Sequence, residues 1–103
     1  MAVGMIRHLV TFQLAATRPA QRAQDAAELR DRLVALSKVI PEVISLDVYF
    51  DVGRIDGHWD AVLVADYASN EDLETYQRHP EHAKVMTFTT SVSAQRAVID
   101  FEL

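Results

Sequence analysis

The period at which apolar residues recur changes along this chain, and these changes limit the possible folds more than any other sequence feature. From Met5 to Leu14, apolar and polar side chains alternate, which predicts a strand with one buried face. From about Ala20 to Ile40, apolar residues recur every three or four positions, which predicts an amphipathic helix that Pro41 ends. Alternation returns over Val43–Val52 and Trp59–Tyr67, which predicts two further strands.

The second half of the chain predicts two short helices and a strand. Ser69 is a good N-cap for a helix that runs to about Arg78. A second helix is expected from Pro80 to about Thr90, with His79 at its N-cap position. Ala94–Phe101 then forms the last strand.

The resulting order is β-α-β-β-α-β, the α+β arrangement called ferredoxin-like. Helices then cover one face of a four-stranded antiparallel sheet. With 103 residues and no Pro-, Gly- or Ser-rich divider, residues 1–103 are expected to form a single domain.

The sheet face away from the helices is too apolar to be left in water. Val62 and Val64 lie on that face of the third strand, and Ala97-Val98-Ile99 makes the last strand apolar on both sides. Two copies that press these faces together would cover them symmetrically. The sequence therefore predicts a homodimer, a dimeric α+β barrel.

Composition excludes several classes of partner. The net charge is −5 with no basic run, which argues against nucleic acid and against anionic membrane surfaces. Arg7 and His8 interrupt the N-terminal apolar stretch, and no segment approaches the ~20 apolar residues of a membrane span. The chain has no cysteine, so thiolate chemistry is excluded and a cytoplasmic location is expected.

Reactive side chains gather in one segment. His82 shares the core-facing side of its predicted helix with Met86 and Thr89, and Tyr76 faces inward from the helix before it. His8 lies on the buried side of the first strand. A neutral imidazole can accept a proton near pH 7, and a phenol can hydrogen-bond a carbonyl oxygen as it gains charge.

Simpler roles for these residues stay open. A histidine on an apolar face is more often structural, and a tyrosine near a helix end usually packs its ring. His79 and His82 with one loose carboxylate are too few ligands for a zinc site, so no metal or other cofactor is expected. Trp59 is more typical of a core or an interface than of a substrate site.

Three segments together resemble a known family. The opening Met5-Ile-Arg-His-Leu-Val-Thr-Phe, the segment Tyr76-x-x-His79-Pro80-x-His82 and the closing Val98-Ile-Asp-Phe are similar to the stress-responsive A/B barrel (Dabb) family. The resemblance covers nearly the whole chain and implies a dimeric α+β barrel. Members include the olivetolic acid cyclase type of polyketide cyclase, which closes a linear tetraketide by aldol condensation without a metal or organic cofactor.

The resemblance also implies roles for individual residues. Tyr76 and His82 match the catalytic pair of that cyclase type, and His8 matches the strand-one histidine of its pocket. The residues expected to bind substrate are His8, Val10, Phe12, Leu29, Leu33 and Leu63.

This chain departs from the cyclase pattern at two places. Leu29, Arg30 and Leu33 stand where the cyclase carries large aromatic residues, so the pocket differs in shape. Arg96 stands where an apolar lining residue is expected; if it points inward, an anionic group on the substrate is favoured.

Three functions follow as hypotheses. The first is a cofactor-independent cyclase, isomerase or lyase that acts on a small carbonyl compound. The second is a non-catalytic dimer that binds a small apolar ligand or stabilises other molecules under stress. The third, by analogy of fold alone, is a cofactor-free monooxygenase or haem-degrading protein.

Overall fold

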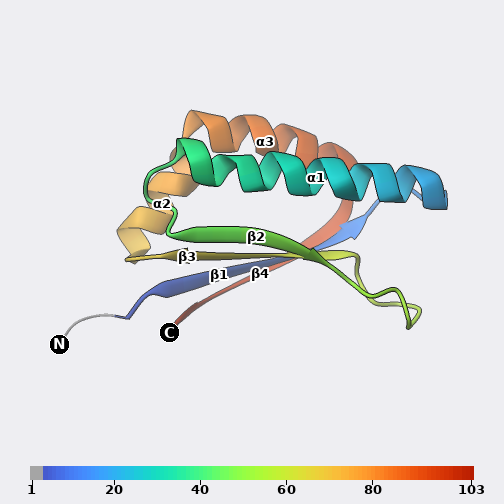
Figure 1. Ribbon diagram of the computed structural model, residues 1–103, viewed down its shortest axis with the longest axis horizontal. Helices are drawn as coiled ribbons and strands as arrows, with labels where there is room; N and C mark the ends of the chain where they lie inside the picture. The colour runs from blue at the N-terminus through green and yellow to red at the C-terminus, as the bar shows by residue number, and fades with distance from the viewer. Residues whose placement is uncertain (1–3) are drawn as a thin grey trace.

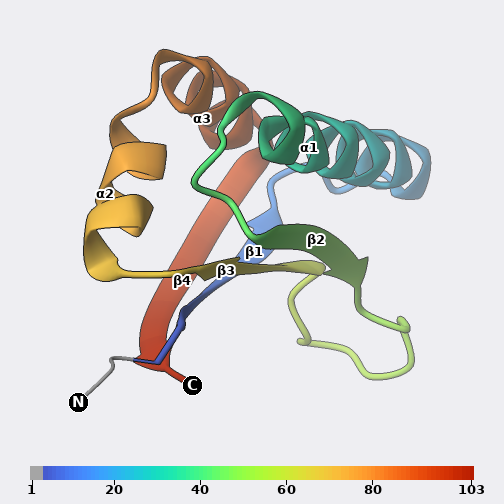
Figure 2. The same cartoon turned by 60° about the vertical axis from the view of Figure 1, so that its left-hand side comes forward.

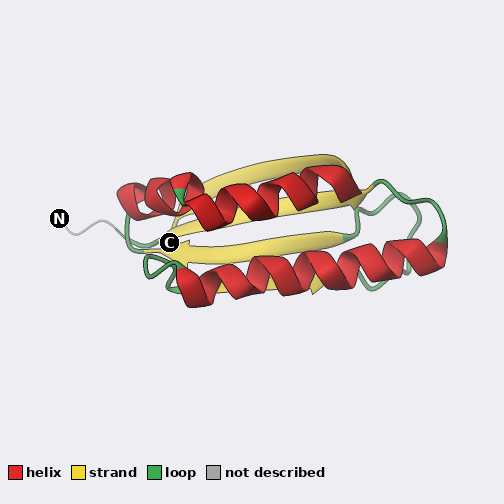
Figure 3. Ribbon diagram, turned by 90° about the horizontal axis from the view of Figure 1, so that it is seen from above, coloured by secondary structure: helices red, strands yellow, loops and turns green. Residues whose placement is uncertain are grey.

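The computed structural model describes residues 4–103, which form one antiparallel sheet with helices on a single face (Figure 1). In chain order the elements are β1 (Ile6–Leu14), α1 (Pro19–Val39), β2 (Ser45–Phe50), β3 (Ala61–Tyr67), α2 (Asn70–Arg78), α3 (Pro80–Val92) and β4 (Ser93–Glu102). The strand order is β2-β3-β1-β4, and every neighbouring pair is antiparallel. Seen from above, α1 and α3 lie side by side along the sheet (Figure 3). The predicted ferredoxin-like order is confirmed, and α2 and α3 are the two short helices that the sequence predicts on either side of His79.

Local sequence explains where the helices begin and end. Pro19 starts α1, where its missing N–H has no helical partner to lose. The Ser69 hydroxyl accepts a hydrogen bond from the Asp72 backbone N–H at 3.1 Å, and the His79 Nδ1 accepts one from Glu81 N–H at 3.0 Å. Both predicted N-caps are therefore confirmed. Within residues 4–103, no helix is both long enough and apolar enough to cross a bilayer.

The core lies between the helices and the inward face of the sheet. Burial alternates strictly along β1, as the period of two predicts. The buried side of α1 carries Leu29, Leu33 and Leu36, which pack on the sheet together with Ile40 just beyond the helix. Burying a leucine or isoleucine fully is worth about 1.5–3 kcal/mol, so these contacts dominate the attachment of α1.

Strand β2 is shorter than the alternation over Val43–Val52 predicts. It ends at Phe50, which pairs with Ala61 at the start of β3. Beyond this rung the chain leaves the sheet as a loop that projects from the domain (Figure 2). Ile44 and Val52, near the two ends of this alternation, lie outside β2 and are exposed, Val52 to 88%. The pattern was misleading because alternation continues past the last residue that has a strand partner.

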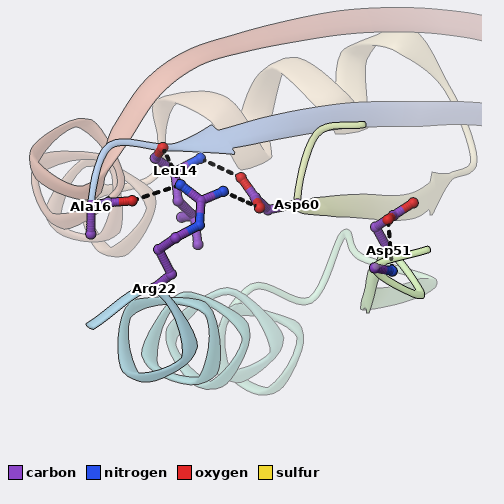
Figure 4. A network of polar contacts seen from close by, with 6 residues as sticks. Leu14, Ala16, Arg22, Asp51 and Asp60 are labelled. Atoms are coloured by element: carbon purple, nitrogen blue, oxygen red, sulfur yellow. Dashed lines mark hydrogen bonds and ion pairs between the residues drawn. The ribbon is translucent and has the colours of Figure 1, made fainter. Parts of the chain in front are cut away.

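A polar network connects the first turn of α1 to the end of β1 and to Asp60, just before β3. The Asp60 carboxylate accepts hydrogen bonds from the Leu14 backbone N–H at 2.8 Å and from the Arg22 guanidinium. Arg22 also donates to the backbone oxygens of Leu14 and Ala16 (Figure 4). One ion pair thus satisfies backbone groups at the point where β1 ends and the chain turns toward α1.

The outward face of the sheet carries an apolar patch. Val62 and Val64 lie half-buried on β3, and Ile99 on β4 is 66% exposed. One ion pair also lies on this face: the Arg7 guanidinium donates two hydrogen bonds to the Asp66 carboxylate, at 2.8 and 2.9 Å. This pairing holds the pKa of Asp66 below its usual range.

The Asp60 network predicts a stability difference. In Asp60→Ala the Leu14 N–H and the Arg22 guanidinium lose their carboxylate partner, so unfolding in urea should require about 1–3 kcal/mol less free energy. Asp56→Ala, in the exposed loop, is the matched control and should change stability by less than about 0.5 kcal/mol. Equal stabilities for the two variants would show that the network does not hold α1 to the sheet.

Candidate functional site

A cavity of about 410 Å³ opens between the inward face of the sheet and the helices. This volume lies within the range of pockets that hold small organic molecules. Its walls come from β1, α1, β3, α2, α3 and β4, and they are apolar with a few polar groups. The lining residues are His8, Val10, Phe12, Leu33, Leu63, Tyr76, Gln77, His82, Met86, Thr90, Arg96 and Val98.

The cavity brings together every residue that the sequence analysis placed in the site except Leu29. Tyr76 and His82, proposed as the catalytic pair, both line it. His8, Val10, Phe12, Leu33 and Leu63 line it as well. Leu29 does not: it is fully buried in the core, one helical turn before Leu33. Leu29 therefore packs in the core and not in the cavity wall.

The rings of Tyr76 and His82 meet edge to face. Their centroids are 4.7 Å apart and their planes lie at 66°. Tyr76 belongs to the end of α2 and His82 to the first turn of α3. The chain turns at His79 and Pro80, and this break allows the two side chains to face one another.

His8 reaches the same cluster from the sheet. Its Nδ1 lies 2.5 Å from a carboxylate oxygen of Asp100, the residue directly opposite on β4. Because a carboxylate oxygen accepts the hydrogen bond, Nδ1 carries the proton and Nε2 remains available. The imidazole ring lies 6.5 Å from the Tyr76 ring, centroid to centroid. Asp100 therefore fixes the orientation of His8 within the cavity wall.

Tyr67 is a member of the aromatic cluster that the sequence analysis missed. Its fully buried ring lies 5.2 Å from the Tyr76 ring and 6.5 Å from His8, between centroids. Its hydroxyl has no hydrogen-bond partner among the described residues. The signal was available, because Tyr67 continues the alternation of Leu63 and Ala65 on the inward face of β3.

Burial keeps Tyr67, Tyr76 and His82 uncharged near pH 7. Burial lowers the pKa of His82, and the nearby His8 and Arg96 lower it further, while the Gln77 backbone opposes the shift. Burial raises the pKa of Tyr76 to about 12. It also raises the pKa of Tyr67. At pH 7 the site therefore offers the neutral imidazole of His82, which can accept a proton, and the Tyr76 phenol, which can donate a hydrogen bond.

No metal centre is formed by the described residues. Across residues 4–103, no three His, Asp or Glu side chains converge as they would around a metal ion. The Nδ1 of His79 is engaged as the cap of α3, separate from His82. The donor set of the cavity suits proton transfer to and from an organic ligand.

Solved structures of other proteins share this fold. A dimeric ferredoxin-like protein of unknown function from Bacteroides fragilis is 22% identical, with a TM-score of 0.87 and full coverage of both chains. A second dimeric ferredoxin-like protein of unknown function, from Thermobifida fusca, is 25% identical over 98% of this chain and 92% of its own, with a TM-score of 0.79. A hydroxynitrile lyase from Passiflora edulis is 14% identical over 97% and 94%, with a TM-score of 0.76.

Comparison of sequences gives the family. None of the curated proteins compared with this chain matches it. Residues 6–103, nearly the whole chain, match the family model described as the Stress responsive A/B Barrel Domain. The chain therefore belongs to the stress responsive A/B barrel domain (Dabb) family.

Proposed function

We propose that this protein is a cofactor-independent enzyme that moves a proton on a small carbonyl compound. The observation that carries the proposal is the edge-to-face contact of Tyr76 and His82 in the wall of a ligand-sized cavity. A lowered pKa keeps His82 neutral, so the imidazole can act as a general base at pH 7.

The proposed step is enolisation. His82 accepts a proton from the carbon next to the carbonyl group, and the bonding pair moves to form the enolate. The Tyr76 hydroxyl donates a hydrogen bond to the enolate oxygen, where the negative charge develops. Returning the proton at another carbon gives an isomerase, whereas attack of the enolate on a second carbonyl gives an aldol cyclase.

A lyase reaction would use the same groups. When a base removes the hydroxyl proton of a cyanohydrin, the carbon–carbon bond breaks to give a carbonyl compound and cyanide. The hydroxynitrile lyase from Passiflora edulis shares the fold, and this likeness motivates a cyanohydrin as one probe. At 14% identity it does not transfer the activity.

The working form is proposed to be a homodimer joined through the outward sheet faces. At ~25 cal/mol per Å², covering a few hundred square ångströms of this apolar surface contributes several kcal/mol. The structural neighbours from Bacteroides fragilis and Thermobifida fusca are described as dimeric. A chain without cysteine suits the reducing cytoplasm, where we expect the dimer to act.

Proton transfer can be measured directly. We expect the protein to catalyse exchange of the α-protons of 4-phenyl-2-butanone in D₂O, followed by NMR, or cleavage of mandelonitrile to benzaldehyde. His82→Ala should lower the rate of whichever of these two reactions the wild type catalyses by about 100-fold or more, because it removes the base. His58→Ala, an exposed histidine outside the cavity, is the matched control and should keep full activity.

The controls separate catalysis from binding. Circular dichroism should show that His82→Ala remains folded. Ligand-induced thermal stabilisation of the wild type with neither exchange nor cleavage would support the non-catalytic alternative. Unchanged turnover in His82→Ala would exclude this residue as the base.

The pH dependence has a definite sign. The pKa of His82 lies below its ordinary value of 6.5, so the neutral base persists into mildly acidic solution. For the reaction that the wild type catalyses, kcat/KM should therefore stay constant near pH 7. As the pH is lowered it should fall through an inflection below pH 6.5. His8, Tyr76 and Arg96 are the titratable or charged groups that face His82 across the cavity. An inflection at or above pH 6.5 would contradict a neutral His82.

The proposed dimer can be tested by its mass in solution and by a substitution on the outward face of the sheet. Light scattering of the wild type at micromolar concentration should give twice the chain mass of 11.6 kDa. Ile99→Glu places a charge on the outward face and should shift the mass toward the monomer. Val39→Glu makes the same kind of change at an exposed position of α1 and should leave the dimer intact. A wild type that is monomeric under these conditions would refute the proposed assembly.

A further inference from the structure

Arg96 brings a positive charge to the rim of the cavity. It lies on β4 directly opposite Phe12 of β1, and Val98, its neighbour on the same side of β4, lies opposite Val10. All four side chains line the cavity. The register of β4 therefore directs the exposed Arg96 guanidinium toward the ligand space beneath the helices.

The guanidinium has no carboxylate partner in the described chain. Its Nη1 lies 3.4 Å from the Met86 sulfur, and a thioether is only a weak acceptor. Arg7, Arg22 and Arg32 each pair with an acidic side chain within 4.0 Å, whereas residues 4–103 offer no such partner to Arg96. In a chain of net charge −5, this cation is left free for a ligand.

The rest of the cavity wall contains no negative charge. Apart from Arg96 and the two histidines, the lining residues are apolar or neutral polar. Asp100 is hydrogen-bonded to His8 and does not line the cavity. An anion entering the site therefore meets one attractive guanidinium and no opposing carboxylate.

Arg96 and the Tyr76–His82 pair line the same cavity. It contacts Met86, which follows His82 by one turn of α3, a rise of about 6 Å. An anionic group at Arg96 and a carbonyl group at Tyr76 and His82 can therefore belong to one small ligand in the same cavity. Arg96 is the one arginine or lysine among the residues that line the cavity, so a single carboxylate fits better than a phosphate.

We propose that Arg96 binds the carboxylate of an oxo acid whose carbonyl group reaches Tyr76 and His82. This assignment rests on the proposed function for the role of the carbonyl group, but the binding of the carboxylate can be tested alone. Arg96 also lowers the pKa of His82, which agrees with the two groups facing the same space.

The test compares two probes of equal shape, 4-oxo-4-phenylbutanoate and its neutral amide, 4-oxo-4-phenylbutanamide. Dissociation constants are measured by NMR titration for the wild type and for Arg96→Gln, Arg96→Lys and Arg78→Gln. The wild type should bind the acid at least about 10-fold more tightly than the amide. Arg96→Gln should abolish this preference and leave the affinity for the amide within twofold, and Arg96→Lys should retain part of it.

Arg78→Gln is the charge-matched control, because Arg78 is exposed on α2 and lies outside the cavity. It should keep the preference for the acid. The assignment is overturned if the wild type binds the acid no better than the amide, or if Arg96→Gln retains the difference.

Exchange of the acid's α-protons in D₂O, measured on the same samples, separates this inference from the proposed function. Loss of the acid preference in Arg96→Gln without any exchange in the wild type supports the carboxylate site and contradicts the enzyme. Exchange that depends on His82, with an acid preference that does not depend on Arg96, supports the enzyme and contradicts the carboxylate site.

Discussion

Strand β1 lies at the centre of the sheet, and its inward side chains belong to the core and to the cavity at once. Ile6 and Leu14 at its ends are packed in the core, whereas His8, Val10 and Phe12 between them form the cavity floor. Because side chains alternate along a strand, a shift of one residue would move all five to the outward face. Pairing with β3 on one side and β4 on the other prevents such a shift.

Burial gives the site its chemical character. Removal from water raises the pKa of Tyr76 and of Tyr67, so both phenols stay protonated. It lowers the pKa of His82, so the imidazole stays neutral. His8 stays oriented through Asp100, which lies at the half-exposed edge of the cluster. The cavity thus combines a base, hydrogen-bond donors and an apolar wall, with one cation, Arg96, at its rim.

Much of this arrangement could be predicted from the sequence, because it depends on local periodicity. The alternation along β1 placed His8 with Val10 and Phe12, and the Pro80 break placed Tyr76 and His82 on facing turns of two helices. These predictions needed only the geometry of one strand and one turn. The inward position of Tyr67 follows from the same rule, applied to the last residue of β3.

Features that depend on register or on packing between distant segments could not be predicted. The pairing of Asp100 with His8 and the position of Arg96 opposite Phe12 both depend on how β4 aligns with β1 across more than eighty residues of chain. Leu29 was predicted to line the cavity, but it lies in the core. The sequence does not distinguish these two places, because either would bury a leucine on the inner side of α1. The end of β2 depends on where β3 begins, which the alternation over Val43–Val52 does not reveal.

The central claim is that His82 is a neutral base facing a ligand in the cavity. An NMR titration of the imidazole signals, assigned with His82→Ala, measures this directly. The signal of His82 should titrate with a midpoint below pH 6.5, and it should shift when 4-oxo-4-phenylbutanamide is added. A midpoint at or above pH 6.5, together with no response to the ligand, would contradict the claim.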